Sequence, residues 1–292
     1  MSTSSDLILN RMEIEEAGPN SSRMAAAVVR QLEGEGRVPV MEVAKALDII
    51  ELRGEPLENL EGALLTDAER SSGSILFNAK SGLPRQRFTV AHELCHFLNI
   101  RHRQTAEAGF RCSRSDMRIS QLGRDHEDNW HRQQEFEANQ FAIELLIPSR
   151  RMGPFLRREL AIETMLDMNS LFDVSREAAG RRLIECHDEV GAIVFSKDGR
   201  VRYAITNGRF PKLAITRDVS MPVSVQKILK GPQSLSQLEE ADPADWLGEP
   251  DTCGLFEQTL VQQNGYAMTL LVADDDDEED DVEDAAPWFD RS

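Results

Sequence analysis

The chain has 292 residues, of which 40% are hydrophobic and 29% are charged, and its formal net charge is −18 at pH 7. This length suits two domains, or one domain with a large appendage. No apolar run approaches the ~20 residues that a membrane-spanning helix needs. Ten of the negative charges lie between Asp274 and Asp284, which leaves about −8 for the rest (−18 less −10). A broadly acidic body argues against strong nonspecific binding to nucleic acid.

The N-terminus and the cysteines favour a cytoplasmic location. Residues 1–6 lack the basic and apolar regions of a signal peptide. The four cysteines are scattered without paired spacing, which is typical of reduced thiols; they are Cys95, Cys112, Cys186 and Cys253. Residues 1–20 have no clear pattern, so we expect a flexible N-terminal segment.

The first ordered elements are expected to be short. A helix over Met24–Leu32, with a serine N-cap at position 21 or 22, precedes a second helix near Met41–Leu47. Strands are expected at Gly62–Leu65 and Ser74–Phe77. The segment Ile75–Phe77 is either an ordinary sheet strand or the strand that pairs with an extended substrate.

The run Arg87–Leu98 is apolar at helical spacing and contains the sequence His-Glu-Leu-Cys-His. His92 and His96 are four residues apart and therefore share one face of the helix. Two imidazoles so placed can bind one Zn²⁺, and Glu93 between them can take a proton from the attacking water. The pattern predicts a metal site on a buried helix.

The spacing leaves two candidates for a third ligand. His102 lies six residues beyond His96, as in the extended metzincin motif, although Asn99 stands where that motif has a glycine. Glu135 lies on a second predicted helix, Gln133–Leu146, with small neighbours on its face. Asn139, one turn later, could hydrogen-bond a ligating imidazole. Glu137 lies on another face of the same helix and is the weaker choice.

Between these helices, residues 103–131 form a long polar insert with several arginines. A long loop inside a compact domain is uncommon unless it has a function, so it could form a wall of the cleft or a lid. His126 and His131 lie in this insert. Each is either a solvated loop residue or a group that polarises the scissile carbonyl.

The chain is expected to be helical from Arg150 to about His187. Met165–Phe172 followed by Val174–Ile184 has the spacing of a helix-turn-helix, with Ser175 as an N-cap. A helical pair packed on the catalytic core is the alternative, and the acidic chain favours it. DNA binding is therefore not expected.

The last third of the sequence changes to paired strands. Gly191–Phe195 and Val201–Ile205 flank an Asp-Gly turn, and Leu255–Gln262 and Tyr266–Val272 flank Asn264-Gly265. A helix is expected near Val223–Leu229, between the two hairpins. The sequence thus predicts a small α+β module at 188–272, followed by an acidic disordered tail at 273–292.

The two central helices resemble the ImmA/IrrE family of zinc metallopeptidases. The resemblance is in Arg-Phe-Thr-Val-Ala-His-Glu-Leu-Cys-His and in Glu-Phe-Glu-Ala-Asn-Gln-Phe-Ala-Ile-Glu-Leu-Leu-Ile-Pro, and it extends over about 35–185. It implies a zincin-like, gluzincin-type α+β core of helices with a small sheet at 21–187. It also implies Zn²⁺ bound by His92, His96 and Glu135, with Asn139 in support and Glu93 as the catalytic base. Cys95 is then a core residue.

This resemblance makes a regulatory metallo-endopeptidase the leading hypothesis. Family members often cleave a helix-turn-helix transcriptional repressor encoded nearby, which releases stress or mobile-element genes. The competing hypothesis is a metal-binding regulatory or sensor protein that acts by protein or DNA binding without proteolysis.

Overall fold

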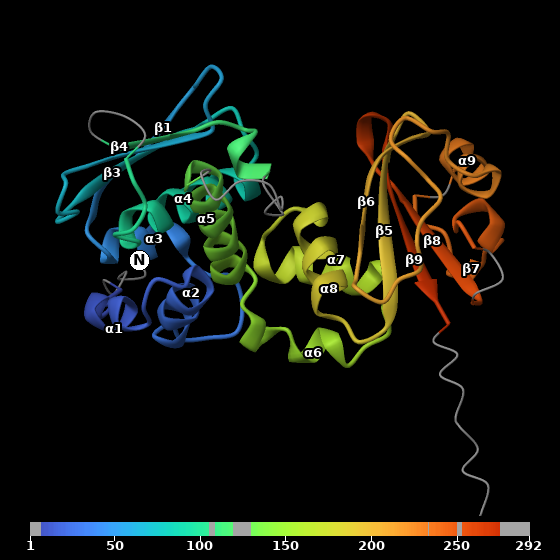
Figure 1. The fold of residues 1–292 in the computed structure, drawn as a ribbon, viewed down its shortest axis with the longest axis horizontal. Helices are drawn as coiled ribbons and strands as arrows, with labels where there is room; N and C mark the ends of the chain where they lie inside the picture. The colour runs from blue at the N-terminus through green and yellow to red at the C-terminus, as the bar shows by residue number, and fades with distance from the viewer. Residues whose placement is uncertain (1–6, 105–108, 119–129, 233, 250–252, 275–292) are drawn as a thin grey trace, which may run out of the picture. The chain divides into compact units, whose positions relative to one another are not determined.

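The structure is a computed structural model, and it describes residues 7–104, 109–118, 130–232, 234–249 and 253–274 (Figure 1). The chain divides into two compact units. Unit 1 comprises residues 1–159 and 163–186, and unit 2 comprises residues 160–162 and 187–292. None of the helices in the described ranges combines the length and apolar character that a membrane crossing requires. Both units contain helices and a sheet, which confirms the mixed α+β fold.

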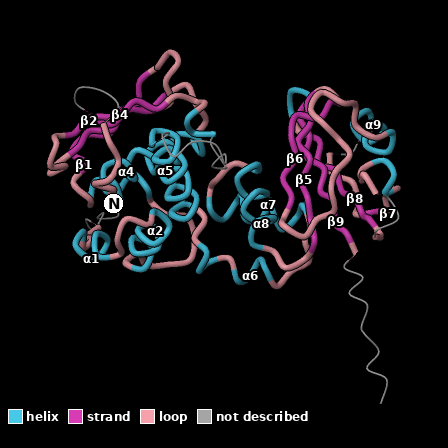
Figure 2. Tube along the Cα trace, viewed as in Figure 1, coloured by secondary structure: helices cyan, strands magenta, loops and turns pink. Residues whose placement is uncertain are grey.

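Unit 1 packs a four-stranded sheet against a group of helices (Figure 2). Its elements are α1 (Arg11–Glu16), α2 (Ser21–Arg30), α3 (Val40–Ala46), β1 (Ile49–Glu55), β2 (Gly62–Thr66), β3 (Gly73–Asn78), α4 (Leu83–Leu98), β4 (Gly109–Cys112), α5 (Trp130–Leu146), α6 (Gly153–Leu156), α7 (Ile162–Phe172) and α8 (Arg176–Cys186). Short 3-10 turns follow at Asp116–Arg118 and Ser149–Arg151.

The strand order in this sheet is β1-β3-β2-β4. Strand β3 pairs in parallel with β1 and antiparallel with β2. Of the two alternatives for Ile75–Phe77, the ordinary sheet strand is the correct one, because both sides of β3 are already paired and cannot receive a substrate. Among the described strands, β4 lies at the edge on the side of β2, and Gly62 is opposite Cys112 in their antiparallel register.

Helix α4 forms the centre of unit 1, with β2 and β3 on one side and α5 on the other (Figure 1). Every residue from Thr89 to Leu98 is buried. The burial is complete at Val90, Leu94 and Phe97, as the apolar helical pattern predicts. Helix α5 packs in turn against α2. The helix that carries the histidines is thus fixed by tertiary contacts along its length.

Two elements near the N-terminus differ from the sequence prediction. Residues 11–16, expected to be flexible, form helix α1 because Ile14 is fully buried and the Asn10 side chain accepts a hydrogen bond from the Met12 amide. Helix α2 begins at Ser21, but its N-cap is Asn20, which accepts from the Arg23 amide. The Ser21 side chain is instead buried beside Cys95.

Unit 2 contains an antiparallel sheet with the order β6-β5-β9-β8-β7. Its elements are β5 (Val190–Lys197), β6 (Arg200–Thr206), α9 (Val223–Lys230), β7 (Glu239–Glu240), β8 (Leu255–Val261) and β9 (Tyr266–Ala273). Both predicted hairpins are present, as is the predicted helix. Trp246 is fully buried in the apolar cluster on this sheet. The acidic segment from 275 onward lies outside the described residues, and the predicted division into functional domains remains a prediction.

Candidate metal centre

His92 is oriented by α5 so that one ring nitrogen faces a common centre. Its Nδ1 lies 3.0 Å from Asn139 Oδ1, and the Asn139 amide nitrogen donates to the Asp116 carbonyl. Because an amide oxygen only accepts, Nδ1 carries the proton and Nε2 presents a lone pair. Nε2 lies 3.1 Å from Glu135 Oε2. Asn139 thus has the supporting position that the sequence suggested.

His96 is oriented in the same way by a second chain of hydrogen bonds. Its Nδ1 lies 2.9 Å from His102 Nδ1, and His102 Nε2 lies 3.1 Å from Glu137 Oε2. The carboxylate can only accept, so His102 donates from Nε2 and accepts at Nδ1 from His96. His96 therefore also turns an Nε2 lone pair inward. His102, the alternative third ligand, stands behind His96 and holds it in place.

The turn that carries His102 is itself fixed by a buried arginine. The Arg70 guanidinium donates to the carbonyl oxygens of Asn99 and His102. It also lies over the ring of Phe110, which stacks on His96 with centroids 4.6 Å apart. This support was not visible in the sequence, since Arg70 lies in a loop between β2 and β3.

Three ligand atoms converge on one point. The two Nε2 atoms of His92 and His96 are 3.2 Å apart, and Glu135 Oε1 is 3.5 Å from His96 Nε2. Metal bonds of about 2.0–2.2 Å at tetrahedral angles place ligand atoms roughly 3.3–3.6 Å apart. Two inward lone pairs at this distance repel unless a cation or a proton lies between them. The residues therefore fit a divalent metal ion.

The electrostatics of the metal-free centre follow from burial opposed by Glu135. Burial lowers the pKa of His96 to about 3, against the pull of the Glu135 carboxylate. For His92 burial also lowers the pKa, but the hydrogen bond and charge of Glu135 outweigh it and raise the pKa. Burial raises the pKa of Glu135, yet the two imidazoles reverse this and keep it well below its usual range. A charged carboxylate beside a neutral His96 is a donor set ready for a cation.

Glu93 lies next to the centre but is not part of the converging set. It is fully buried, and neither carboxyl oxygen makes a well-formed hydrogen bond within the described part of the chain. Burial raises its pKa to about 7, although His92 and the nearby Cys112 thiol lower it somewhat. Strand β2 leaves room for this carboxyl at Gly62, where a Cβ would lie 2.5 Å from Glu93 Oε1. The glycine is thus required by the close approach of β2 to α4.

Cys112 joins the centre from strand β4, and the sequence analysis did not predict this. Its Sγ and the ligand atoms of His92, His96 and Glu135 all lie within 4.8 Å of one another, and all four residues are buried. The alternation of buried Phe110, exposed Arg111 and buried Cys112 is a strand signal that could have revealed it.

Of the two histidines in the insert, His126 lies outside the described residues. His131 lies in the first turn of α5, and its Nε2 lies 3.8 Å from Glu135 Oε1 with its side chain 39% exposed. It is therefore close to the centre while still open to solvent. That position is compatible with contact to a bound substrate.

Side chains of the helix-turn-helix-like segment make contacts within the protein. Ser175 caps α8 by accepting from the Ala178 amide, as expected. Arg182, on the second helix of this segment, donates to Glu144 and to the hydroxyl of Ser149. Its neighbours Leu183 and Ile184 are fully buried. These contacts favour a helical pair packed on the core.

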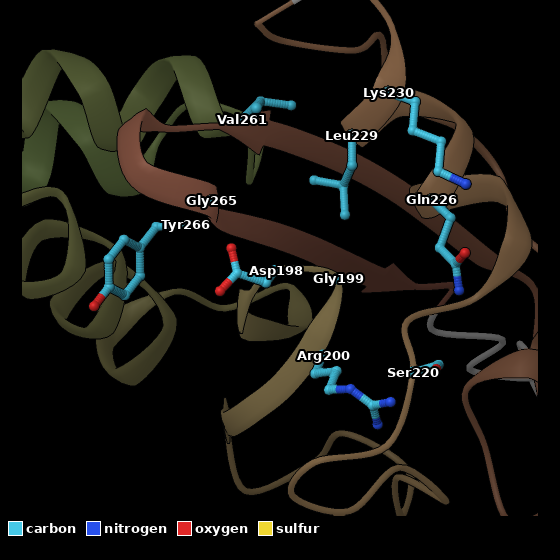
Figure 3. Close-up of a pocket in the computed structure, with 10 residues that line it drawn as sticks. All are labelled: Asp198, Gly199, Arg200, Ser220, Gln226, Leu229, Lys230, Val261, Gly265 and Tyr266. Carbon is cyan, nitrogen blue, oxygen red and sulfur yellow. The ribbon is translucent and has the colours of Figure 1, made fainter.

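Unit 2 contains a separate pocket of about 360 Å³ between its two hairpin turns and α9 (Figure 3). The turns are joined by a hydrogen bond from the Asp198 amide to the Gly265 carbonyl. Arg200 and Lys230 supply positive charge and Asp198 a negative one. This mixed lining selects no class of ligand by its charge.

The part of the chain that contains α4 and α5 matches a known family. Residues 49–184 match the model of the peptidase family described as the IrrE N-terminal-like domain. This part of the chain belongs to that family. The match covers α4 and α5 and leaves residues 187–292 outside. The family points to a metallopeptidase, and the buried His, Glu and Cys cluster is compatible with a metal ion.

A solved structure supports the fold. A transcriptional regulator of Mycobacterium tuberculosis matches with a TM-score of 0.53 at 11% identity, over 90% of this chain and 78% of that chain. At this identity the likeness concerns the fold alone. No curated protein matches the chain.

Proposed function

We propose that the protein is a zinc-dependent endopeptidase with a gluzincin-type core in unit 1. The observation that carries the proposal is the convergence of two histidine Nε2 atoms and Glu135 beside Glu93, a buried carboxyl one residue from a ligand. Two imidazoles and a carboxylate are a common donor set of catalytic zinc sites, which leave one position open. Zinc supplies Lewis acidity, which polarises a carbonyl and lowers the pKa of bound water.

Residues of the chain supply proton transfer, orientation of the imidazoles and contact with the substrate. Glu93 takes the proton from the attacking water and returns it to the leaving amine, because its buried carboxyl lies one residue from a ligand and beside the centre. Asn139 and His102 keep the two imidazoles in the correct tautomer. His131, half-exposed beside Glu135, hydrogen-bonds the carbonyl oxygen of the substrate.

Strand β4 is the element that receives the peptide. It lies at the edge of the described sheet and ends at the metal centre with Cys112. An extended substrate can add to such an edge through main-chain hydrogen bonds. β4 therefore takes the role that the sequence analysis considered for Ile75–Phe77.

The substrate we propose is a helix-turn-helix transcriptional regulator, and the reaction is its regulatory cleavage in a stress response. The family match and the transcriptional regulator among the similar structures both support a regulatory setting. Reduced cysteines suit the cytoplasm, where such a regulator acts. Direct DNA binding is not part of the proposal, because Arg182 is held by Glu144.

The test uses the purified protein with Zn²⁺ and the co-encoded regulator. Wild type should cleave the regulator, and Glu93→Gln should bind the same amount of zinc but cleave about 10²–10⁴ times more slowly. Cleavage is followed by mass spectrometry and zinc by elemental analysis. Equal cleavage by the two proteins would remove Glu93 from its role. Zinc binding without cleavage by either would favour a non-proteolytic regulator.

A further inference from the structure

The metal centre contains one more potential ligand than a catalytic zinc site needs. Cys112 ends strand β4 and is opposite Gly62 of β2 in an antiparallel pair. Opposite residues of such a pair have side chains on the same face of the sheet. Gly62 leaves room for Glu93 on that face, so Cys112 faces the same space. Its Sγ is within 4.8 Å of each of the three other ligand atoms.

The other buried cysteine of unit 1 provides a contrast. Cys95 lies on α4 between the two histidines in sequence, yet its Sγ is 3.7 Å from the Ser21 hydroxyl and 3.9 Å from the Glu137 carbonyl. It is not among the four groups that meet at the centre. Cys95 therefore has a packing role, whereas Cys112 is in the donor set.

Two histidines, one carboxylate and one thiolate form a complete four-coordinate set for zinc. A site closed in this way has no position for water, as in structural zinc sites. We propose that Cys112 is the fourth ligand of the resting metal centre and that it keeps the peptidase latent until it withdraws. The latency rests on the function proposed above, while the ligation does not.

Cys112 is also the ligand on the least constrained element. The histidines lie on α4, which packs between the sheet and α5, and Glu135 lies on α5 between α4 and α2. β4 has four residues and pairs with β2 alone among the described strands. Its last residue accepts one hydrogen bond, from the Glu61 amide. A peptide that pairs with β4 along the edge that no other described strand occupies would act directly on the strand that carries the thiolate.

The ligation is tested by spectroscopy, without any substrate. The full chain is loaded with Co²⁺ or Zn²⁺ as wild type, as Cys112→Ser and as the matched control Cys95→Ala. Wild type and the control should show a thiolate-to-cobalt charge-transfer band and a sulfur scatterer at about 2.3 Å from zinc. Cys112→Ser should lose both but keep one metal per chain. Wild type that is fully loaded with nitrogen and oxygen ligands only would overturn the proposal.

The latency is tested by cleavage of the co-encoded regulator with the same three proteins. If about nine-tenths of the resting centres are closed, Cys112→Ser should cleave about 10-fold faster than wild type and the control. A variant that cleaves no faster, with sulfur ligation shown, would overturn the latency. Sulfur ligation without cleavage by any of the three would contradict the peptidase function and leave the ligation standing. Cys112→Ala, which cannot supply an oxygen ligand, should behave as Cys112→Ser does.

Discussion

A cluster of buried polar side chains in each unit shows two different ways in which such groups are accommodated. In unit 2, two buried side chains pair with complementary groups: Trp246 Nε1 donates to Glu257 at 2.9 Å, and the Gln258 side-chain oxygen accepts from the Ile162 amide at 2.9 Å. In unit 1, two imidazole lone pairs face each other at 3.2 Å, and Glu93 is buried without a well-formed partner in the described chain. Burying polar groups without partners costs about 1–3 kcal/mol each.

Buried polar residues that stabilise the fold can be distinguished from those that bind a ligand by where their partners lie. Complementary pairs, such as the hydroxyls of Thr259 and Thr269 at 3.0 Å, stabilise the sheet of unit 2 by themselves. In unit 1, a cation placed between the two imidazoles and Glu135 would satisfy the lone pairs that face one another there. A cation at their centre is therefore coupled to the stability of unit 1 and should leave unit 2 unchanged.

Removing the charge of Glu135 should have the largest effect. Glu135→Gln keeps the shape of the side chain but removes the anionic ligand, so we expect loss of bound zinc and of cleavage. In wild type, zinc at 100 times its dissociation constant should stabilise unit 1 by about 2.7 kcal/mol. Hydrogen exchange measured with and without zinc should show this as protection in α4 and α5, which the variant lacks.

The same hydrogen-exchange experiment tests whether the stabilisation by zinc is confined to unit 1. Peptides from β5 and β9 are the internal control, because unit 2 has no part in the cluster. If zinc protected β5 and β9 as strongly as α4, the centre would not be confined to unit 1. Unchanged protection of α4 would show that His92, His96 and Glu135 are not the ligands.

Gly62→Ala should disable Glu93 without touching a ligand. The added Cβ would lie 2.5 Å from Glu93 Oε1 and from the Thr89 methyl group, so one of them must move. Displacing the base should cost about 10²-fold or more in cleavage rate, while zinc remains bound. Gly208→Ala is the matched control, since nothing lies within 4 Å of its new Cβ. A variant as active as the control would mean that this close packing is not needed.

The sequence indicated which residues lie together where the information is local, while their roles remain predictions. His92, Glu93 and His96 lie on one apolar helix, and the pattern of α5 placed Glu135 and Asn139 on its inner face. Spacing alone could not choose between Glu135 and His102. That choice depends on how α4 and α5 pack, which brings Glu135 to both Nε2 atoms and leaves His102 behind His96.

Features that depend on distant pairing were missed. Strand β4 has four residues and begins at Gly109, whose φ of +146° permits its backbone to approach Leu64. It exists because it pairs with β2, more than forty residues away in sequence. From the sequence alone, Cys112 was therefore interpreted as part of a polar insert. Helix α1 was missed for a related reason, because a single buried side chain, Ile14, ties it to the core.

Glu93 should make the stability of metal-free unit 1 depend on pH. Burial raises its pKa from 4.5 to about 7, so the folded state holds a proton that the unfolded state releases in this range. The stability that Glu93 contributes is present below about pH 4.5 and is lost as the pH rises through about 7. Glu93→Gln cannot titrate, so its advantage over wild type should grow by at most about 3 kcal/mol across this window.

Urea unfolding in a chelator, at about pH 5 and pH 8, measures this advantage for unit 1. Taking the difference between variant and wild type cancels the titration of His96, whereas the pKa of His92 also responds to the Glu93 charge, so the difference reports this coupled pair. An advantage that is the same at both pH values would mean that Glu93 is not held protonated by its burial.

Asn139→Ala should have a smaller effect, on metal affinity. Without the Asn139 oxygen the His92 ring loses the acceptor that fixes its Nδ1 proton, and Nε2 is no longer held toward the centre. Loss of such a supporting group typically lowers metal affinity by 10- to 100-fold. His102→Ala should lower metal affinity in the same way, because His102 orients the imidazole of His96 as Asn139 orients that of His92. Zinc titration against a competing chelator measures both. If zinc affinity were unchanged in both variants, packing alone would orient the two rings. The hydrogen bonds of Asn139 and His102 would then stabilise the fold of unit 1, as the buried pairs described above do in unit 2.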